Sequence, residues 1–487
     1  MPRTLICETV TGRTTADLVA ARDAATVGDM VELRLDGVAD VDVAAALHGR
    51  RRPVVATCRP AWEGGHFEGS DEERRRILEH ALDLGADFVD IEWRSLHRCL
   101  GFDDLLRRAR SRVVVSSHDF DRVPVDLDAR ARAMRSTGAA VIKIAVMANR
   151  LMDTVPLMDI ARAGDAVVIG MGDAGLPTRL FAARYGSKWT YAGDGVAPGQ
   201  ITACRMVDEF RFRSVTSSAR LFGVVSENAR HSISPALHNA AFGAAGIDAL
   251  YLPLRAADFA DFLAFAKALG VEGASITIPF KLDALAAASR TDDLARSVGA
   301  ANTLRFRSGE CEATNTDVAG FLEPLESAFP RPLEGARASV LGGGGGARAV
   351  IVALRSRGAL VTVHTRRAGQ AREVAETLGA RVGPWPPAAG SWDLLVNTTP
   401  LGSAGLRRES PIPDGAFDGA LAYDLTYGPG ESLLLEQARL AGCRTLDGLA
   451  MLIAQAERQF EWWTGQKPAA GVMRAAAHTK LGITPCA

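Results

Sequence analysis

The strongest constraint on the fold is a series of eight short β-type runs that alternate with helical segments through the first part of the chain. The runs occupy residues 5–7, 31–34, 54–57, 88–92, 113–116, 141–144, 166–169 and 189–191. Strands that alternate with helices build parallel sheets, and eight such pairs close into a barrel. We therefore predict an α/β protein whose N-terminal part, residues 1–213, is a (β/α)8 TIM barrel.

Polar side chains stand at or just after several of these predicted strands, where a barrel gathers them around one mouth. They are Glu32, Arg34, Arg59, Glu63, Glu92, His118, Lys143 and Arg179. Lys143 is the strongest candidate, because only six of the 56 basic residues are lysines and this one lies in an apolar run. Burial would favour a neutral amine, which can form an imine with a ketone, whereas arginine cannot. The charged run at residues 71–76 is interpreted as a solvated helix face.

Several barrel motifs together resemble type I 3-dehydroquinate dehydratase, over about residues 3–210. They stand at residues 32–36, 57–59, 63–65, 117–120, 143–145 and 197–200. The resemblance implies that Lys143 forms an imine with the C3 ketone of 3-dehydroquinate, that His118 moves the proton from C2, and that Glu63 orients His118. It further assigns the carboxylate and hydroxyls of the substrate to Glu32, Arg34, Arg59, Arg179 and Gln200. Val196 is a departure, since many relatives carry serine there.

A glycine-rich loop dominates the second half of the chain. The apolar run at residues 339–341 ends in five glycines, 342–346, and then enters a helical pattern. Glycines allow close approach to a phosphate, which the N–H groups of the helix start can bind. About 20 residues on, where an acid would bind a ribose hydroxyl, the chain carries Thr365, Arg366 and Arg367. Arginines suit a 2′-phosphate, so we predict NADP(H) rather than NAD.

An ordered set of further motifs is similar to shikimate dehydrogenase, over about residues 219–482. The motifs include residues 231–235, 275–281, 299–303, 315–317, 397–402, 423–427 and 447–455. The resemblance makes Lys281 and Asp317 the catalytic pair. It assigns the substrate to Ser232, Ser234, Thr277, Asn302, Thr316, Tyr427 and Gln455. It assigns the cofactor to Gly342, Gly344, Gly345, Gly346, Ala347, Thr365, Arg366, Arg367, Asn397, Thr398 and Gly448.

These resemblances imply a particular domain order. After the barrel, a small polar stretch at residues 214–218 is expected to be a linker. A shikimate dehydrogenase-like substrate-binding domain is then expected at residues 219–318, completed by residues 462–487. Between its two parts, residues 319–461 are expected to form a Rossmann NADP-binding domain.

The composition excludes several other classes. A hydrophobic content of 47% with 23% charged residues is typical of a globular protein, and a net charge of −1 gives no footprint for nucleic acid. No apolar run is long enough for a membrane span. Seven cysteines without close pairs favour free thiols in a reducing cytoplasm. The oligomeric state stays open between monomer and homodimer.

The two resemblances describe consecutive reactions of the shikimate pathway, which leads to chorismate and the aromatic amino acids. Dehydration of 3-dehydroquinate gives 3-dehydroshikimate, and NADPH-dependent reduction gives shikimate. One alternative is an NAD-dependent quinate/shikimate dehydrogenase fused to another Schiff-base lyase, which Arg366 and Arg367 argue against. Another is a non-catalytic metabolite sensor, which would be expected to have lost groups such as Lys143 and Lys281.

Overall fold

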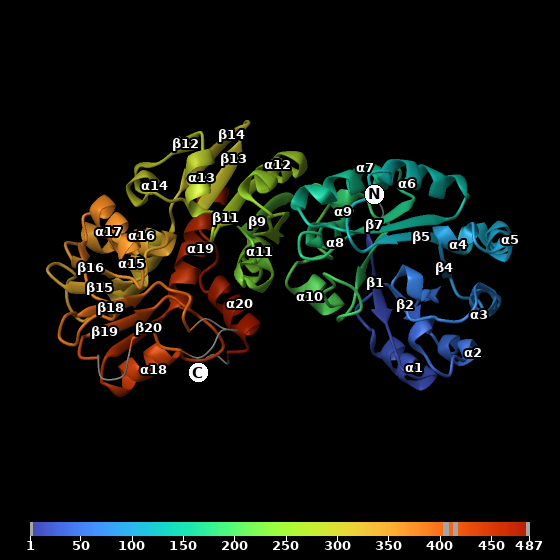
Figure 1. The fold of residues 1–487 in the computed structure, drawn as a ribbon, viewed down its shortest axis with the longest axis horizontal. Coiled ribbons are helices and arrows are strands. Elements are labelled where there is room, and N and C mark those ends of the chain that lie inside the picture. The colour runs from blue at the N-terminus through green and yellow to red at the C-terminus, as the bar shows by residue number, and fades with distance from the viewer. Residues whose placement is uncertain (1–2, 403–408, 413–416, 484–487) are drawn as a thin grey trace. The chain divides into compact units, whose positions relative to one another are not determined.

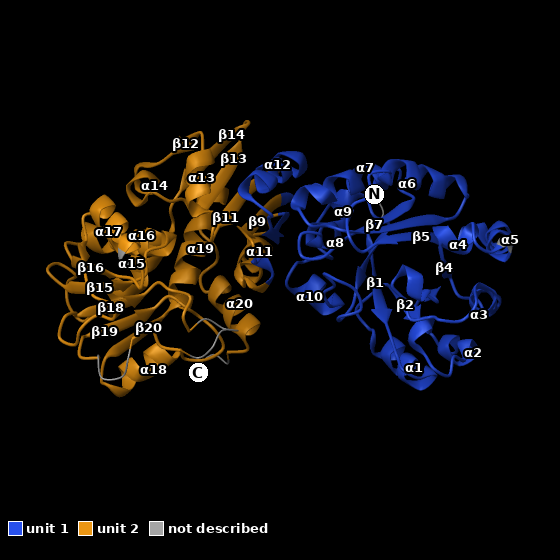
Figure 2. Cartoon of the chain, viewed as in Figure 1, with its two compact units in different colours: residues 1–220, 228–230, 248–270 blue, residues 221–227, 231–247, 271–487 orange. Residues whose placement is uncertain are grey.

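The structure is a computed structural model that describes residues 3–402, 409–412 and 417–483. The chain forms two compact units (Figures 1 and 2). The first comprises residues 1–220, 228–230 and 248–270, and the second comprises residues 221–227, 231–247 and 271–487. None of the helices within the described ranges is both long and apolar enough to cross a membrane.

The first unit contains the predicted parallel barrel. Its strands are β1 (Leu5–Val10), β2 (Met30–Arg34), β3 (Val54–Thr57), β4 (Phe88–Glu92), β5 (Val113–Asp119), β6 (Val141–Met147), β7 (Ala166–Met171) and β8 (Trp189–Ala192). Their order is β7-β6-β5-β4-β3-β2-β1-β8. At the β7–β8 seam the Lys188 N–H donates to the Ala166 carbonyl at 3.0 Å. The predicted strands are confirmed.

Helices and short 3-10 turns follow the strands of the barrel. They are α1 (Thr15–Ala24), η1 (Leu35–Gly37), α2 (Val43–Leu47), η2 (Ala61–Glu63), α3 (Asp71–Asp83), α4 (Trp93–Leu96), α5 (Leu100–Ala109), η3 (Arg110–Arg112), α6 (Leu127–Ser136), η4 (Leu151–Thr154), α7 (Val155–Ala161), α8 (Leu176–Leu180), α9 (Ala182–Tyr185) and α10 (Ala203–Asp208). Ser70 and Glu73 form a capping box that starts α3. The interpretation of residues 71–76 as a solvated face is wrong at Arg74, which is fully buried because its guanidinium reaches carboxylates.

Apolar side chains fill the barrel interior on the side of the amino ends of the strands. Val55, Val114, Val141 and Val167 come from β3, β5, β6 and β7 and form one buried cluster with Trp189 of β8. Side chains alternate in direction along a strand, so later residues with the same inward direction lie nearer the carboxyl ends. On β6, Lys143 follows Val141 in this way, which places its amine above the apolar layer at the barrel mouth.

Two later elements also belong to the first unit, β10 (Ala249–Arg255) and α12 (Phe259–Leu269). Asp261 of α12 is buried, and its carboxylate accepts the N–H groups of Leu151 and Met152 at 2.9 and 3.0 Å. Asp261 therefore binds the start of η4, in the loop that follows the lysine-bearing strand β6.

The second unit begins with a mixed sheet. Its strands are β9 (Arg220–Ser226), β11 (Val271–Ile276), β12 (Arg290–Thr291), β13 (Thr303–Arg307) and β14 (Glu310–Thr314). Within this unit they lie in the order β9-β11-β13-β14-β12, which is part of a six-stranded sheet, with β9 parallel to β11 and β13 antiparallel to both β11 and β14. The α-helices of this unit that precede or lie between these strands are α11 (Ser234–Ala244), α13 (Lys281–Ala287) and α14 (Asp293–Val298), and η5 (Ala229–His231) lies where the two units meet in the sequence.

A second sheet of this unit is entirely parallel, as a Rossmann domain requires. Its strands are β15 (Arg337–Leu341), β16 (Leu360–His364), β17 (Arg381–Val382), β18 (Leu394–Asn397), β19 (Leu421–Asp424) and β20 (Arg444–Asp447), in the order β17-β16-β15-β18-β19-β20. Its helices, and those that return to the mixed sheet, are α15 (Asp317–Ala328), α16 (Gly345–Ser356), α17 (Ala368–Leu378), α18 (Leu433–Leu440), α19 (Gly448–Thr464) and α20 (Val472–Leu481).

Candidate active sites

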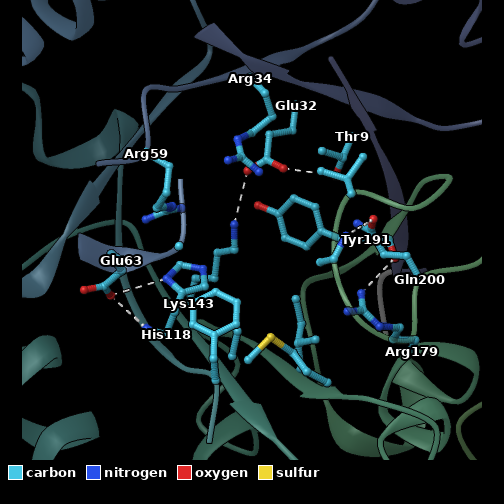
Figure 3. A pocket seen from close by; sticks show the side chains of 17 residues that line it. Thr9, Glu32, Arg34, Arg59, Glu63, His118, Lys143, Arg179, Tyr191 and Gln200 are labelled. Carbon is cyan, nitrogen blue, oxygen red and sulfur yellow. Dashed lines mark hydrogen bonds and ion pairs between the residues drawn. The ribbon is translucent and has the colours of Figure 1, made fainter. Parts of the chain in front are cut away.

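A pocket opens at the mouth of the barrel, and every barrel residue to which the resemblance assigns a role lines it (Figure 3), whereas Glu92, also expected at the mouth, is fully buried and does not. The lining residues with an assigned role are Glu32, Arg34, Arg59, Glu63, His118, Lys143, Arg179 and Gln200. They come from β2, the segment after β3 that includes η2, β5, β6, α8 and the loop after β8. The parallel strands explain this convergence, because their carboxyl ends meet at one rim.

Lys143 lies at the centre of the pocket with 4% of its surface exposed. Its Nζ is 3.2 Å from a carboxylate oxygen of Glu32 and 3.2 Å from one of Asp90, and 4.2 Å from the ring centroid of Tyr191. The amine was expected among apolar side chains, and that expectation is wrong. Its apolar sequence neighbours belong to the strand, while the side chain reaches two buried carboxylates on β2 and β4.

His118 and Glu63 form a second pair in the pocket. The backbone N–H of His118 donates to Glu63 Oε1 at 2.9 Å, and Nδ1 of the His118 ring is 3.4 Å from the same oxygen. Burial, with the charges of Arg59 and Lys143, lowers the pKa of His118 well below its usual range. Burial raises the pKa of Glu63 to about 7, although Arg59 opposes this shift. His118 is therefore a neutral base at neutral pH.

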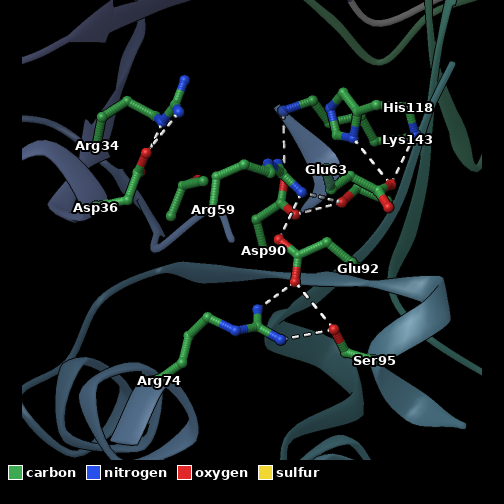
Figure 4. A network of polar contacts seen from close by, with 12 residues as sticks. Arg34, Asp36, Arg59, Glu63, Arg74, Asp90, Glu92, Ser95, His118 and Lys143 are labelled. Atoms are coloured by element: carbon green, nitrogen blue, oxygen red, sulfur yellow. Dashed lines mark hydrogen bonds and ion pairs between the residues drawn. The ribbon is translucent and has the colours of Figure 1, made fainter. Parts of the chain in front are cut away.

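A buried network of ion pairs surrounds the lysine (Figure 4). The Arg59 guanidinium lies 2.9 Å from Asp90 and 2.7 Å from Glu92, and donates to Ser116 Oγ at 2.8 Å. Burial acts to raise the pKa of Asp90, but the charges of Arg59 and Lys143 outweigh it and the pKa is lowered. Asp90 is thus held as a carboxylate beside the catalytic candidate.

Two further arginines reach the pocket in different ways. Arg34 makes a bidentate pair with Asp36 at 2.9 and 2.7 Å. Arg179 is 1% exposed, and its guanidinium donates to the carbonyls of Tyr191 and Pro198 at 3.2 and 3.4 Å. Burial lowers the pKa of Arg179 to about 10. Since its recorded partners are carbonyls, this charge is well placed to meet an anionic substrate.

Three polar residues of this site, Thr9, Asp90 and Tyr191, were not predicted from the sequence. Thr9 and Tyr191 line the pocket, and Thr9 donates to Glu32 at 3.0 Å. Asp90 contacts both Lys143 and Arg59. The signal for Asp90 was present, because it stands two residues before Glu92 on one strand and shares its direction. Val196, which the sequence carries in place of the serine expected from the resemblance, also lines the pocket.

The second cluster lies in the second unit around Lys281, the first residue of α13. Its Nζ is 2.5 Å from Asp317 Oδ2, and its side chain is 15% exposed. The Asn302 amide donates to the other Asp317 oxygen at 2.7 Å and to Thr316 Oγ1 at 3.0 Å. Gln455 lies close by, with its Oε1 3.5 Å from the same amide nitrogen. Four of the predicted residues are therefore brought to Lys281.

The remaining predicted substrate residues lie on neighbouring elements of this unit. Ser232 is half-buried and accepts the N–H of Ser234 at 3.2 Å, and Ser234 is buried at the start of α11. Thr277 is half-buried after β11, and its N–H donates to the Val225 carbonyl at 3.2 Å. Tyr427 is half-buried after β19. Within the described ranges, none of these four side chains forms a hydrogen bond or an ion pair with Lys281.

The glycine loop fits a dinucleotide phosphate. Gly342 has φ of +114°, and a Cβ there would meet Thr398 Oγ1 at 2.5 Å. A Cβ on Gly344 or Gly346 would meet nothing within 4 Å, so the loop is open on that side. Gly344 caps α16 without a side-chain hydrogen bond, which leaves the first N–H groups of this long helix for an anion.

The other predicted cofactor residues flank this loop. Arg366 and Arg367 are exposed after β16, and Thr365 Oγ1 donates to the Arg367 carbonyl at 2.6 Å. Asn397 is buried and donates to Asp424 at 2.9 Å, which fixes the turn after β18. The remaining predicted cofactor residues are Ala347, which is buried in α16, Gly345, which lies against the Lys281 side chain, and Gly448, which starts α19.

Comparison with family models divides the chain in the same order. Residues 6–217 match the type I 3-dehydroquinase model. Residues 224–304 match the shikimate dehydrogenase substrate binding domain, and residues 448–478 match the shikimate 5′-dehydrogenase C-terminal domain.

One relative matches nearly the whole chain. The chloroplastic bifunctional 3-dehydroquinate dehydratase/shikimate dehydrogenase of Arabidopsis thaliana is 32% identical over 470 residues, which are 90% of this chain and 78% of the relative. The chain belongs to this family. The bifunctional dehydratase/dehydrogenase resemblance is thereby confirmed, together with the expected fold class of a TIM barrel followed by a shikimate dehydrogenase-like region.

Relatives of the dehydrogenase part carry NADP in their names. The shikimate dehydrogenase (NADP(+)) of Oleidesulfovibrio alaskensis is 41% identical over 51% of this chain and 91% of the relative. A solved shikimate dehydrogenase in complex with NADP+ is 28% identical, with a TM-score of 0.51 over 55% of this chain and 97% of its own. Another, from Thermus thermophilus with NADP(H) and shikimate, is 34% identical with a TM-score of 0.50 over 54% and 100%. The expected cofactor, NADP, is confirmed for this bifunctional family member.

Proposed function

We propose that this bifunctional enzyme dehydrates 3-dehydroquinate at the barrel pocket and reduces the product, 3-dehydroshikimate, at the Lys281 cluster. The observation that carries the first assignment is a buried amine, Lys143, beside a neutral histidine in one pocket. The second assignment is carried by the Lys281–Asp317 pair, whose lysine lies against the glycine loop at Gly345.

In the proposed dehydratase reaction, the Lys143 amine adds to the C3 carbonyl and water is lost to leave an imine. The imine draws electrons from the neighbouring C2–H bond, so His118 can accept that proton. The electrons then return to expel the C1 hydroxyl, to which His118 gives its proton so that water leaves. Hydrolysis of the imine frees Lys143. Glu63 accepts from the His118 ring and keeps it oriented.

The remaining pocket residues are proposed to bind the substrate. A carboxylate substrate is attracted by Arg179 and Arg59, and its hydroxyls can bond to Glu32, Arg34 and Gln200. Glu32 is itself fixed by Thr9 and by Thr57, which donates to it at 2.9 Å. The polar lining therefore matches a small polyhydroxylated acid.

In the proposed reduction, bound NADPH supplies a hydride to the C3 carbonyl carbon. Lys281 hydrogen-bonds to the carbonyl oxygen and gives a proton to the alkoxide, while Asp317 keeps the ammonium in place. Asn302 and Thr316 are held against this pair and are proposed, with Ser232, Ser234, Thr277, Tyr427 and Gln455, to bind the substrate's carboxylate and hydroxyls.

The cofactor is proposed to lie along the glycine loop. Gly342, Gly344, Gly345 and Gly346, with Ala347, would receive its pyrophosphate at the start of α16. Arg366 and Arg367 would bind the 2′-phosphate beside Thr365. Asn397, Thr398 and Gly448 would support the loops around the nicotinamide. The domain limits 1–213, 219–318 with 462–487, and 319–461 are part of this proposal.

Cellular context is proposed from composition. The described cysteines are free thiols, as expected in a reducing compartment, and the net charge is −1. We infer a cytoplasmic enzyme that acts on small molecules and does not bind nucleic acid, as monomer or homodimer.

The dehydratase assignment is tested by trapping the imine. Borohydride added with 3-dehydroquinate should label Lys143, as peptide mass spectrometry would show. Lys143→Arg keeps the charge between the two carboxylates but cannot form an imine, so dehydratase turnover should fall roughly 10⁴-fold or more while dehydrogenase turnover persists. A label elsewhere, or near-normal dehydration by this variant, would refute the assignment.

The dehydrogenase assignment is tested by Lys281→Ala. Turnover of 3-dehydroshikimate should drop on the order of 10²–10⁴-fold because the proton donor is gone. NADPH binding, followed by cofactor fluorescence, and dehydration of 3-dehydroquinate should both remain. Reduction at the normal rate would overturn the role of Lys281.

A further inference from the structure

Arg74 is a buried cation outside the dehydratase pocket. It lies in α3 within a run of charged residues, yet it has 0% of its surface exposed. Its guanidinium carbon lies 4.5 Å from the ring centroid of Phe102, so an aromatic face covers one side. Burying a charge is costly unless partners compensate, and those partners define what Arg74 does.

The partners of Arg74 lead to the pocket (Figure 4). One nitrogen makes a short ion pair with Glu92 Oε2, and another donates to Ser95 Oγ at 2.6 Å and to Asp71 at 3.0 Å. Ser95 Oγ in turn donates to the same Glu92 oxygen at 3.2 Å. The other oxygen of Glu92 is left to face Arg59 at 2.7 Å.

Glu92 is thus shared between one arginine in the pocket and one outside it. It is fully buried, and burial together with the nearby Asp90 raises its pKa, against the effect of Arg59 and Arg74. Arg59 must also pair with Asp90 at 2.9 Å. Without Arg74, Glu92 would keep only the Ser95 hydroxyl and Arg59, which also pairs with Asp90, so it would be free to turn or take a proton.

We propose that Arg74 is a positioning residue of the dehydratase reaction, which holds Glu92 in the orientation that fixes the Arg59 guanidinium for substrate binding. Arg74 therefore acts on Arg59 through Glu92. In the described part of the chain, its side chain forms no hydrogen bond or ion pair with a residue that lines the pocket. The inference rests on the proposed role of Arg59 in binding 3-dehydroquinate.

The test compares Arg74→Met and Arg74→Lys in the full-length chain. Arg74→Met should raise the KM for 3-dehydroquinate about tenfold or more, because Glu92 loses the charged partner that holds it against Arg59. Arg74→Lys should restore part of this loss because it keeps the charge but not the forked geometry. KM does not depend on how much enzyme is folded, so a merely structural role would lower apparent kcat and leave KM unchanged.

Arg22 provides a matched control. It is a buried arginine on α1 of the same unit, and it donates to the carbonyls of Ala46 and His48 at 2.6 and 2.9 Å without lining the pocket. Arg22→Met and Arg22→Lys should leave the KM for 3-dehydroquinate within about twofold of the parent value, even if they lower the melting temperature.

Arg59→Lys separates the two levels of the inference. If this variant leaves KM unchanged, the proposed role of Arg59 is wrong. If Arg59→Lys raises KM while Arg74→Met and Arg74→Lys leave it at the parent value, the positioning role of Arg74 is wrong and the proposed function stands. Should Arg74→Met fail to fold, the KM of Arg74→Lys decides alone, with a value within twofold of the parent counting against the inference.

Discussion

In the proposed dehydratase mechanism, two groups with displaced pKa values, Glu63 and His118, determine how the activity depends on pH. His118 keeps a lowered pKa, so it is already a neutral base across the neutral range. Glu63 has a pKa of about 7 because it is buried, so it is protonated below that pH and ionised above it. The ionised form is the stronger hydrogen-bond acceptor for the His118 ring N–H, because its charge strengthens the bond. We therefore expect Glu63, not His118, to be the group whose protonation lowers dehydratase activity in acid.

We predict that kcat/KM for dehydration rises with pH through a transition near pH 7. In Glu63→Gln this transition should disappear, and the pH-independent value should fall roughly 10-fold or more because the amide orients the ring less well. The measurement is a pH profile from about pH 5 to 9, with the dehydrogenase reaction of the same chain as control. The same acid transition in Glu63→Gln would show that another group is responsible.

Arg366 and Arg367 are exposed after β16, where they are proposed to select the cofactor. Replacing both with alanine should raise the KM for NADPH on the order of tenfold or more and change that for NADH little, because only NADPH carries the 2′-phosphate. Arg372→Ala removes an exposed arginine of the following helix α17; it is the control and should change neither value. Equal effects on both cofactors would contradict the proposal.

At the scale of elements, the barrel could be predicted from sequence because its signal is local. Each parallel strand is buried on both faces, so β3 and β7 appear as short apolar runs bounded by polar segments. The order of the runs then fixes which strand ends meet, and this was enough to bring Lys143, His118 and Glu63 to one rim.

Contacts between elements could not be predicted in this way. Whether Arg74 faces solvent depends on Glu92, a residue of β4 that the helical pattern of α3 does not report. The apolar neighbours of Lys143 likewise describe its own strand, whereas its amine meets Glu32 and Asp90 from two other strands. Periodicity reports which face of an element is buried, but not which groups of other elements lie against that face.

Asp261 shows the same limitation and gives a prediction at this scale. Its buried carboxylate accepts two N–H groups of η4 from α12, so Asp261→Ala would leave those donors unpaired. We expect a loss of about 1–3 kcal/mol in the free energy of unfolding of the first unit. Equilibrium urea titrations that follow dehydratase activity would measure it.

The control for Asp261 is Asp159→Ala on α7 of the same unit. Asp159 is exposed and pairs only with Arg162 one helical turn away, at 2.7 Å, among its recorded contacts in the described chain. Such an exposed pair contributes at most about 1 kcal/mol, so the urea midpoint should barely move. If the two variants shift the midpoint equally, the Asp261 contacts do not stabilise the unit.

At the scale of the whole molecule, the two proposed reactions use separate residues in separate units. The dehydratase residues lie within residues 1–220, whereas Lys281, Asp317 and the glycine loop lie in the second unit. No predicted catalytic side chain is shared. Each activity should therefore survive the loss of the other. In a variant that lacks one activity, the remaining activity can serve as the control.

We predict that a mixture of two variants, each of which lacks one of the two activities, makes shikimate from 3-dehydroquinate. Lys143→Arg should reduce added 3-dehydroshikimate but not convert 3-dehydroquinate, and Lys281→Ala should stop at 3-dehydroshikimate. When the two are combined with NADPH, shikimate should form after a lag, because the intermediate must first accumulate in solution. Product chromatography and NADPH absorbance would follow the reaction. If Lys143→Arg also lost the reduction, or if the mixture stayed inactive, the two sites would not be independent, and the assignment of one reaction to each lysine would have to be abandoned.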